Sequence, residues 1–141
     1  MNKYFLGFLL LGVIISCSHP KPKAEQYISE NDKKVFFPDL KDGDTLTSPF
    51  LVKMGVEGMK IEPAGMSRGG FGHHHILVNR KGWLINKIIP MSDSTFHYGN
   101  GQTEATLELA PGKYILTLQF GDGIHASLGE ELATSINIIV Q

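Results

Sequence analysis

Histidines that could bind a metal ion are concentrated in one short stretch of this chain, Gly72-His73-His74-His75-Ile76. Two further histidines, His97 and His125, lie beside glycine-containing turns. Imidazole is the commonest protein ligand for transition metals, and it titrates near neutral pH. On a β-strand, His73 and His75 would point to the same face with Cα atoms about 6–7 Å apart, so both rings could reach one ion. The sequence therefore predicts a metal site formed by His73, His75, His97 and His125.

Copper and zinc are the metals that we expect at this site, because imidazole-only sites suit Cu(II), Zn(II) or Ni(II). Met59 and Met66 precede the histidine run and could add thioether ligands, although methionine more often fills gaps in a core. A structural role is the alternative: His73 and His75 would then hydrogen-bond the glycine-rich loops around His97 and Gln102. Both interpretations stay open at this point.

His74 has a different expected role from its two neighbours. On a strand it shares its face with Ile76 and Val78, which is the more apolar set. We therefore expect His74 to be a core histidine held by a hydrogen bond, because buried polar groups are costly without a partner.

Catalytic and nucleic-acid-binding patterns are weak in this sequence. Ser92 and Ser94 precede His97, but neither lies in the Gly-x-Ser-x-Gly elbow of a nucleophilic serine. The glycine-rich turns are not phosphate-binding loops, because such a loop follows a parallel strand and opens a helix, and neither turn does so. Without a complete acid–base or nucleophile set, we expect no enzymatic activity. A formal net charge of −1 argues against nucleic acid as a partner.

The first residues are typical of a targeting signal. Lys3 precedes an apolar stretch, Phe5 to Ile15, that is too short to span a bilayer comfortably. The stretch ends in Ile14-Ile15-Ser16-Cys17, which resembles the bacterial lipobox and contains the only cysteine of the chain. The resemblance implies cleavage before Cys17 and lipid attached to its sulfur, and several acyl chains give stable anchoring.

We therefore expect a lipoprotein signal peptide over residues 1–16, an acylated Cys17 with a flexible tether over 17–32, and a folded domain over 33–141. The protein would be anchored to a membrane of the bacterial cell envelope and face the periplasm or the cell exterior.

Short strand patterns recur throughout the folded part. The expected strands lie near residues 35–37, 50–56, 74–79, 83–89, 105–109, 113–120 and 135–140, and residues 40–46 are typical of a turn leading into a further short strand. Turn residues at 80–82 and 110–112 predict two hairpins. Seven to eight short strands without a long helix favour an all-β, antiparallel, immunoglobulin-like β-sandwich. We expect six residues to point into its core: Tyr114, Leu116, Leu118, Phe120, Ile136 and Ile138.

A resemblance to a known family rests on motifs along most of the folded part. They include Val35-Phe36-Phe37-Pro38, Gly72-His73-His74-His75, the run from His97 to Glu104, Leu109-Ala110-Pro111-Gly112-Lys113, and Gly121-Asp122 with His125. This pattern resembles the bacterial domain of unknown function 4399. The resemblance implies a small β domain exported to the envelope, and it implies no particular activity. Two positions that are often histidine or histidine-rich in that family differ here, Thr95 and Ala126-Ser127-Leu128.

Two functions are compatible with these observations. The first is a metal-binding envelope lipoprotein that handles copper or zinc. The second is a non-catalytic structural or interaction module whose histidines hold loops and whose partner is a protein or a wall polymer. The convergence of imidazole nitrogens on one point would favour the first.

Overall fold

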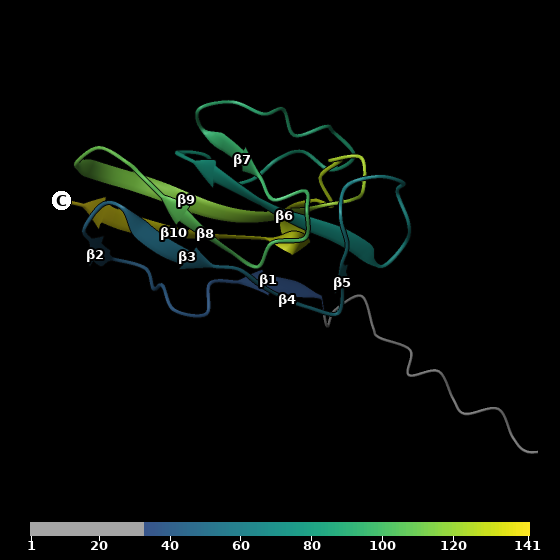
Figure 1. Ribbon diagram of the computed structural model, residues 1–141, viewed down its shortest axis with the longest axis horizontal. Coiled ribbons are helices and arrows are strands. Elements are labelled where there is room, and N and C mark those ends of the chain that lie inside the picture. The colour runs from purple at the N-terminus through teal and green to yellow at the C-terminus, as the bar shows by residue number, and fades with distance from the viewer. Residues whose placement is uncertain (1–32) are drawn as a thin grey trace, which may run out of the picture.

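The computed structural model describes residues 33–141, which form a β-domain (Figure 1). The expected signal peptide, Cys17 and most of the tether lie outside the described residues. The strands are β1 Lys34–Phe36, β2 Asp44–Leu46, β3 Phe50–Lys53, β4 Gly55–Glu57, β5 Lys60–Ile61, β6 Phe71–Val78, β7 Thr95–His97, β8 Glu104–Leu107, β9 Gly112–Gly121 and β10 Ala133–Val140. A 3-10 turn, η2 Glu130–Leu132, precedes β10. Within the described residues there is no helix that could cross a membrane.

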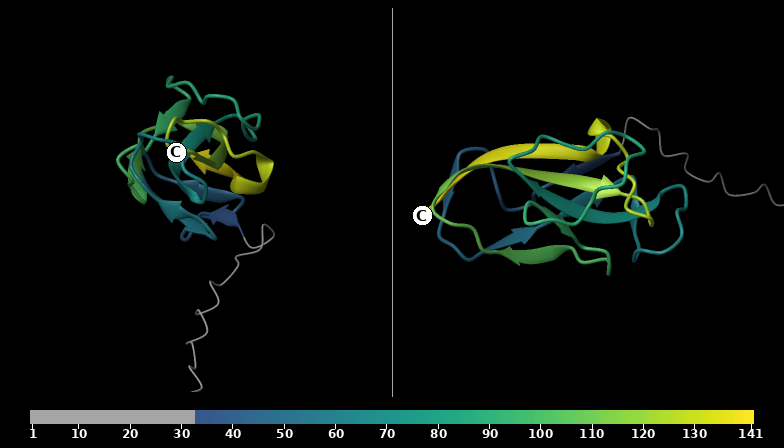
Figure 2. Two further views of the ribbon diagram at one scale, coloured as in Figure 1. Left: turned by 90° about the vertical axis from the view of Figure 1, so that its right-hand side faces the viewer. Right: turned by 90° about the horizontal axis from the view of Figure 1, so that it is seen from above.

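The largest sheet has six strands and mixed direction. Its order is β2-β10-β9-β6-β5, and β7 pairs with another part of β6. The long strands β6, β9 and β10 pair antiparallel, whereas β2 pairs with β10 and β5 pairs with β6 in parallel. Two small sheets, β1-β4 and β3-β8, complete the fold, and the end-on view in Figure 2 shows the strands curled around a common centre.

The all-β class expected from the sequence is confirmed, but the expected antiparallel, immunoglobulin-like sandwich is not. Two parallel pairs contradict a purely antiparallel arrangement. The curled mixed sheet with two small sheets is also not clearly an immunoglobulin-like sandwich. Short strands such as β2 and β5 carry too little periodicity to predict either their direction or their partner.

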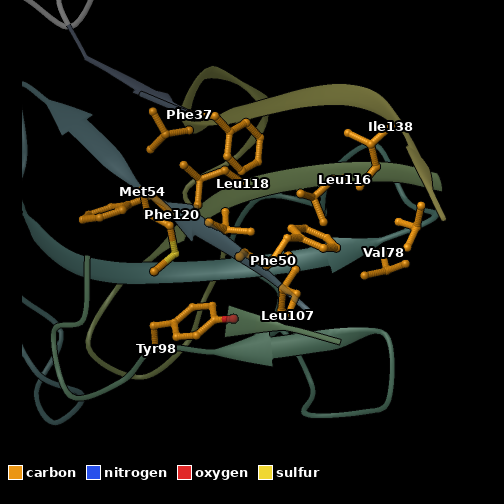
Figure 3. Close-up of a cluster of buried hydrophobic side chains, with 14 of the residues drawn as sticks. Phe37, Phe50, Met54, Val78, Tyr98, Leu107, Leu116, Leu118, Phe120 and Ile138 are labelled. Atoms are coloured by element: carbon orange, nitrogen blue, oxygen red, sulfur yellow. The ribbon is translucent and has the colours of Figure 1, made fainter. Parts of the chain in front are cut away.

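The core lies between the curled sheet and the β3-β8 pair. Leu116, Leu118 and Phe120 project from β9 towards Phe50 of β3 and Leu107 of β8 (Figure 3). The three β9 residues are fully buried, as expected. Thr117 and Gln119, which alternate with them, are fully buried too, so this part of β9 is covered on both faces and not on one. Ile138 is also buried, whereas Tyr114 and Ile136 are only partly buried and pack at the margin of the core.

Both predicted hairpins are wrong. The residues after the first turn, 83–89, form no strand, and they are held by an isolated bridge between Ile88 and Ala126. At the second turn, β8 pairs with β3 while β9 pairs with β6 and β10. Residues 108–111 therefore carry the chain from one sheet to another. A tight Ala-Pro-Gly connection can join two paired strands of a hairpin or two strands of different sheets, so it could not identify the pairing partner of β8.

Candidate metal centre

Strand β6 places the histidine run in the interior of the large sheet. It pairs with β9 on one side, where His73 lies opposite Gly121 and His75 opposite Gln119. On the other side β7 brings His97 opposite His75. All three histidines of β6 are fully buried. The expected alternation is confirmed, because the His73 and His75 rings lie 4.7 Å apart on one face and His74 packs against Phe120 on the other.

His125 reaches the same place from the turn that follows β9. Its backbone has a positive φ of 65°, and its N–H donates to the carbonyl oxygen of Asp122 at 2.9 Å. The Asp122 carboxylate holds the turn: Oδ1 accepts the N–H groups of Ile124 and Ala126 at 3.0 and 2.8 Å, and Oδ2 accepts the hydroxyl of Ser67 at 2.5 Å. Asp122 is thus a positioning residue, and an Asx-type turn is the sequence signal that could have identified it.

Three imidazoles converge in this centre. His125 Nδ1 lies 2.9 Å from His73 Nε2 and 3.2 Å from His75 Nε2. One ligand nitrogen from each of the three residues lies within 4.8 Å of the others, so this group could hold a metal ion.

His97 lies beside the three converging rings without joining their group of ligand nitrogens. Its ring centre is 4.6 Å from that of His75 and 4.7 Å from that of His125. Its Nε2 is buried and has no hydrogen-bond partner. The structure therefore brings all four predicted residues into contact, with His73, His75 and His125 as the convergent set.

Two glycines lie against the imidazoles, and one of them leaves space that a side chain would fill. A Cβ atom on Gly121 would lie 2.6 Å from His75 Cε1, and one on Gly99 would lie 3.5 Å from His125 Cε1. The first distance is shorter than real carbon contacts allow, so Gly121 is required for the observed position of the His75 ring. Sequence reasoning treated these glycines only as turn residues and missed their contact with the site.

Burial keeps the rings neutral. Desolvation, reinforced by the neighbouring imidazoles, lowers the pKa of His73 to about 4 and that of His75 to about 2. Asp122 opposes this effect weakly at His73. The pKa of His97 is also lowered by desolvation, while a hydrogen bond with the backbone of Pro90 acts in the opposite direction. Neutral imidazole is the form that binds metals, so these rings are in the ligating state at neutral pH.

His74 is buried as expected, but the expected hydrogen bond is absent. Neither of its ring nitrogens has a partner, and its ring meets Phe120 edge-on with centroids 5.1 Å apart. Desolvation, followed by the charge of His73, lowers its pKa to about 4. His74 therefore belongs to the apolar side of the sheet and not to the convergent set.

The other predicted contributors lie away from the nitrogens or make other contacts. Gln102 accepts a hydrogen bond from the N–H of Asn100 in its own turn, and the hydrogen bonds between the histidine rings join His125 to His73 and His75 instead. Met59 packs against the hydrophobic core. The Met66 side chain is 81% exposed.

Comparisons with known proteins identify a family. No curated protein and no solved structure matched the chain. The family model described as "Domain of unknown function (DUF4399)" matches residues 52–141, which include β6, β7 and the His125 turn. This match covers more than half of the chain and confirms the resemblance seen in the sequence, so the chain belongs to the DUF4399 family.

Proposed function

We propose that this protein is an envelope lipoprotein whose folded domain binds a transition metal, copper or zinc, through His73, His75 and His125. The convergence of three imidazole nitrogens from two separate segments carries the proposal. The role would be binding and handling of the metal. We further propose that lipid on Cys17 anchors the protein to a membrane.

The spacing of the nitrogens fits a metal site. Tetrahedral ligands with bonds of about 2.0–2.1 Å lie about 3.3–3.4 Å from one another. His125 Nδ1 is 2.9 Å from His73 Nε2 and 3.2 Å from His75 Nε2, so small displacements outward would accommodate an ion. The three rings come from β6 and from an anchored turn, which limits the reorganisation that binding requires.

His97 is the proposed fourth ligand. Its Nε2 is buried without a partner beside the convergent set, and a buried nitrogen without a hydrogen bond is costly. A metal bond would satisfy it. A hydrogen bond between His97 and the Pro90 backbone would also orient the ring, as neighbouring carbonyl groups commonly do for metal-ligating histidines.

The hydrogen bonds that the Asp122 carboxylate accepts favour metal binding without catalysis. It is the carboxylate whose charge acts on His73, and both of its oxygens already accept hydrogen bonds that hold the turn. A carboxylate in that position is occupied as an anchor and is poorly placed to serve as a general base.

A structural module is the second candidate function. The 2.9 Å contact between His73 and His125 is also an ordinary hydrogen-bond length, so the pair could hold the turn against β6 without a metal. In that case the partner of the module would be a protein or a wall polymer.

His125→Asn is the substitution that best separates the two functions. His125 is partly exposed on a turn, and asparagine tolerates its positive φ, so the variant should fold. His74→Leu is the matched control, because it removes an adjacent imidazole that lies outside the convergent set. The measurement is the thermal unfolding of metal-free protein titrated with Zn(II) or Cu(II), alongside direct binding by calorimetry.

Wild type and His74→Leu should be stabilised by metal, by about 2.7 kcal/mol when free metal is a hundredfold above its dissociation constant. His125→Asn should bind much more weakly, and the double variant His73→Ala, His75→Ala should lose binding. If wild type shows no metal-dependent shift, the histidines are structural and the second function replaces the first.

The anchor has an independent test. Metabolic labelling with a radioactive fatty acid in a bacterial host should tag the wild-type chain and leave Cys17→Ser unlabelled. Equal labelling of the two chains would contradict the lipoprotein assignment without affecting the metal proposal.

A further inference from the structure

The segment between β6 and β7 exposes an unusual number of large apolar side chains. Four of them are mostly exposed: Leu84 (70%), Ile85 (62%), Ile88 (54%) and Met91 (75%). Figure 1 shows this segment as a long arch along one edge of the molecule, outside the sheet. Apolar side chains gathered on one exposed segment commonly mark a contact surface.

The backbone of this segment is fixed, so the exposure is not a consequence of a loose loop. The N–H of Asn86 donates to the carbonyl of Ser127, and the N–H of Ser127 donates to that of Lys87, at 2.8 and 2.9 Å. Ile89 is fully buried, and its N–H donates to the carbonyl of His125 at 2.9 Å. The exposed side chains are therefore held outward on a supported strip.

The charges of the segment are suited to an anionic surface. The segment between β6 and β7, residues 79–94, contains three basic residues, Arg80, Lys81 and Lys87, against one acidic residue, Asp93. The Arg80 guanidinium lies over the ring of Trp83, 3.9 Å from its centre. Glu130 and Glu131 lie at the border, where they line a hollow together with Leu84 and Ile85. Trp with flanking basic and aliphatic residues is the composition of membrane-interface segments.

The first described residue, Lys33, lies near this segment. Lys33 and Ile85 line one hollow, together with Leu128. Cys17 precedes Lys33 by sixteen residues in the sequence, which span at most about 55 Å when fully extended. A domain tethered at this distance meets the membrane at a high effective concentration, so a weak contact suffices.

We propose that residues 83–91 form a membrane-contact surface that rests on anionic lipid headgroups, with Leu84, Ile85, Ile88 and Met91 in the interfacial layer. The proposal rests on the proposed membrane anchor and is independent of metal binding. A bilayer is favoured over a protein partner because lysine is depleted from protein interfaces, whereas at a membrane its charge adds to the attraction. The contact would place the His125 turn next to the membrane surface, since Ile89 bonds to it directly.

The chain carries its own reporter for this contact. Trp83 is the only tryptophan of the chain, and it lies at the start of the contact segment. The protein purified from a bacterial host that processes and acylates it at Cys17 is mixed with vesicles of phosphatidylglycerol and phosphatidylcholine, with or without bromine on the acyl chains near the headgroups. Flotation measures anchoring, and Trp83 emission in the floated fraction measures contact of the segment.

We expect a blue shift of Trp83 emission on floated vesicles and a loss of emission when the lipid is brominated. Leu84→Gln with Ile88→Gln should reduce both changes, as should vesicles of phosphatidylcholine alone. Ile139→Gln is the matched control, because Ile139 is an exposed apolar residue of β10 and should leave both signals as in wild type. All variants change exposed side chains, and their thermal unfolding verifies that they fold.

Two outcomes would overturn the proposed membrane contact, and only one of them would also contradict the lipid anchor. Protein that floats with the vesicles but shows equal Trp83 emission in brominated and unbrominated lipid keeps the anchor and excludes the contact. Protein that does not float contradicts both the anchor and the contact.

Discussion

His125 Nδ1 lies 2.9 Å from His73 Nε2, although the two residues are separated by 52 positions in the sequence. The contact depends on a single turn after β9, in which His125 adopts a left-handed backbone conformation. Asp122 holds this turn through two backbone N–H groups and the Ser67 hydroxyl. The position of the third nitrogen of the site is therefore controlled by a carboxylate that does not belong to the convergent set.

Asp122→Ala should weaken metal binding without removing a ligand. Loss of the carboxylate leaves the turn N–H groups without their acceptor, so His125 is no longer held against His73. We expect the free energy of unfolding to fall by about 1–3 kcal/mol and metal affinity to fall by about 10–100-fold. Urea unfolding and calorimetric titration measure the two effects.

Asp42→Ala is the matched control for that variant. Asp42 also accepts a backbone N–H, that of Asn137 at 2.7 Å, but it lies on an exposed turn that is not part of the histidine cluster. It should lose some stability and keep full metal affinity. Equal affinities in the Asp122 and Asp42 variants would show that the Asp122 turn does not position a ligand.

Gly121→Ala should displace the His75 ring. The added methyl group would lie 2.6 Å from His75 Cε1 and 3.1 Å from His75 Nδ1, so the ring would have to move away from its position beside His73, His97 and His125. We expect a destabilisation of about 1–3 kcal/mol from overpacking and a loss of metal affinity. Gly65→Ala, whose Cβ would meet nothing within 4 Å, should behave like wild type. A Gly121 variant with normal affinity would contradict the placement of His75 in the site.

The metal-free protein should lose stability as the pH falls from about 6.5 towards 4. Burial lowers the pKa of His73 and His74 to about 4 and that of His75 to about 2, against 6.5 for the free side chain. In this interval the unfolded chain takes up protons that the folded chain does not. Each such histidine therefore lowers the free energy of unfolding by about 1.4 kcal/mol per pH unit.

Urea unfolding with a chelator present, at several pH values between 4.5 and 8, measures this dependence. The slope should fade between pH 7 and 8 as the histidines of the unfolded chain also become neutral. A free energy of unfolding that stays constant or rises as the pH falls to 4.5 would mean that the buried rings protonate without cost in the folded protein.

The local part of the site could be predicted from the sequence, because alternation along a strand is a property of the backbone. His73 and His75 share a face of β6, and His74 lies opposite, as the period of two requires. The approach of His125 could not be predicted in the same way. It depends on which strands pair and on the left-handed backbone of one residue after β9, and neither is encoded in the spacing of the histidines.

The wrong predictions about the fold have a common origin, which is the pairing of the strands. Residues 83–89 have the apolar content of a strand, yet Leu84, Ile85 and Ile88 point outward and only Ile89 is fully buried. The β8–β9 connection has the composition of a hairpin, yet β8 pairs with β3. Composition reports how well a segment fits an extended conformation, whereas the pairing is decided by the packing of the whole core.

His74→Leu should leave metal binding intact and preserve or raise stability. Leucine is close to histidine in size and would fill the space against Phe120, while the two buried nitrogens that lack partners are removed. Removing a buried polar atom without a hydrogen bond relieves a cost of about 1–3 kcal/mol. The slope of stability between pH 6.5 and 4 should also decrease, because one histidine with a lowered pKa is gone. Urea unfolding at pH 7.5 and pH 5 measures both effects, and calorimetric titration measures metal affinity. A strongly destabilised variant would mean that His74 makes a polar contact in the folded protein, and a loss of metal affinity would move His74 into the site in place of one of its neighbours.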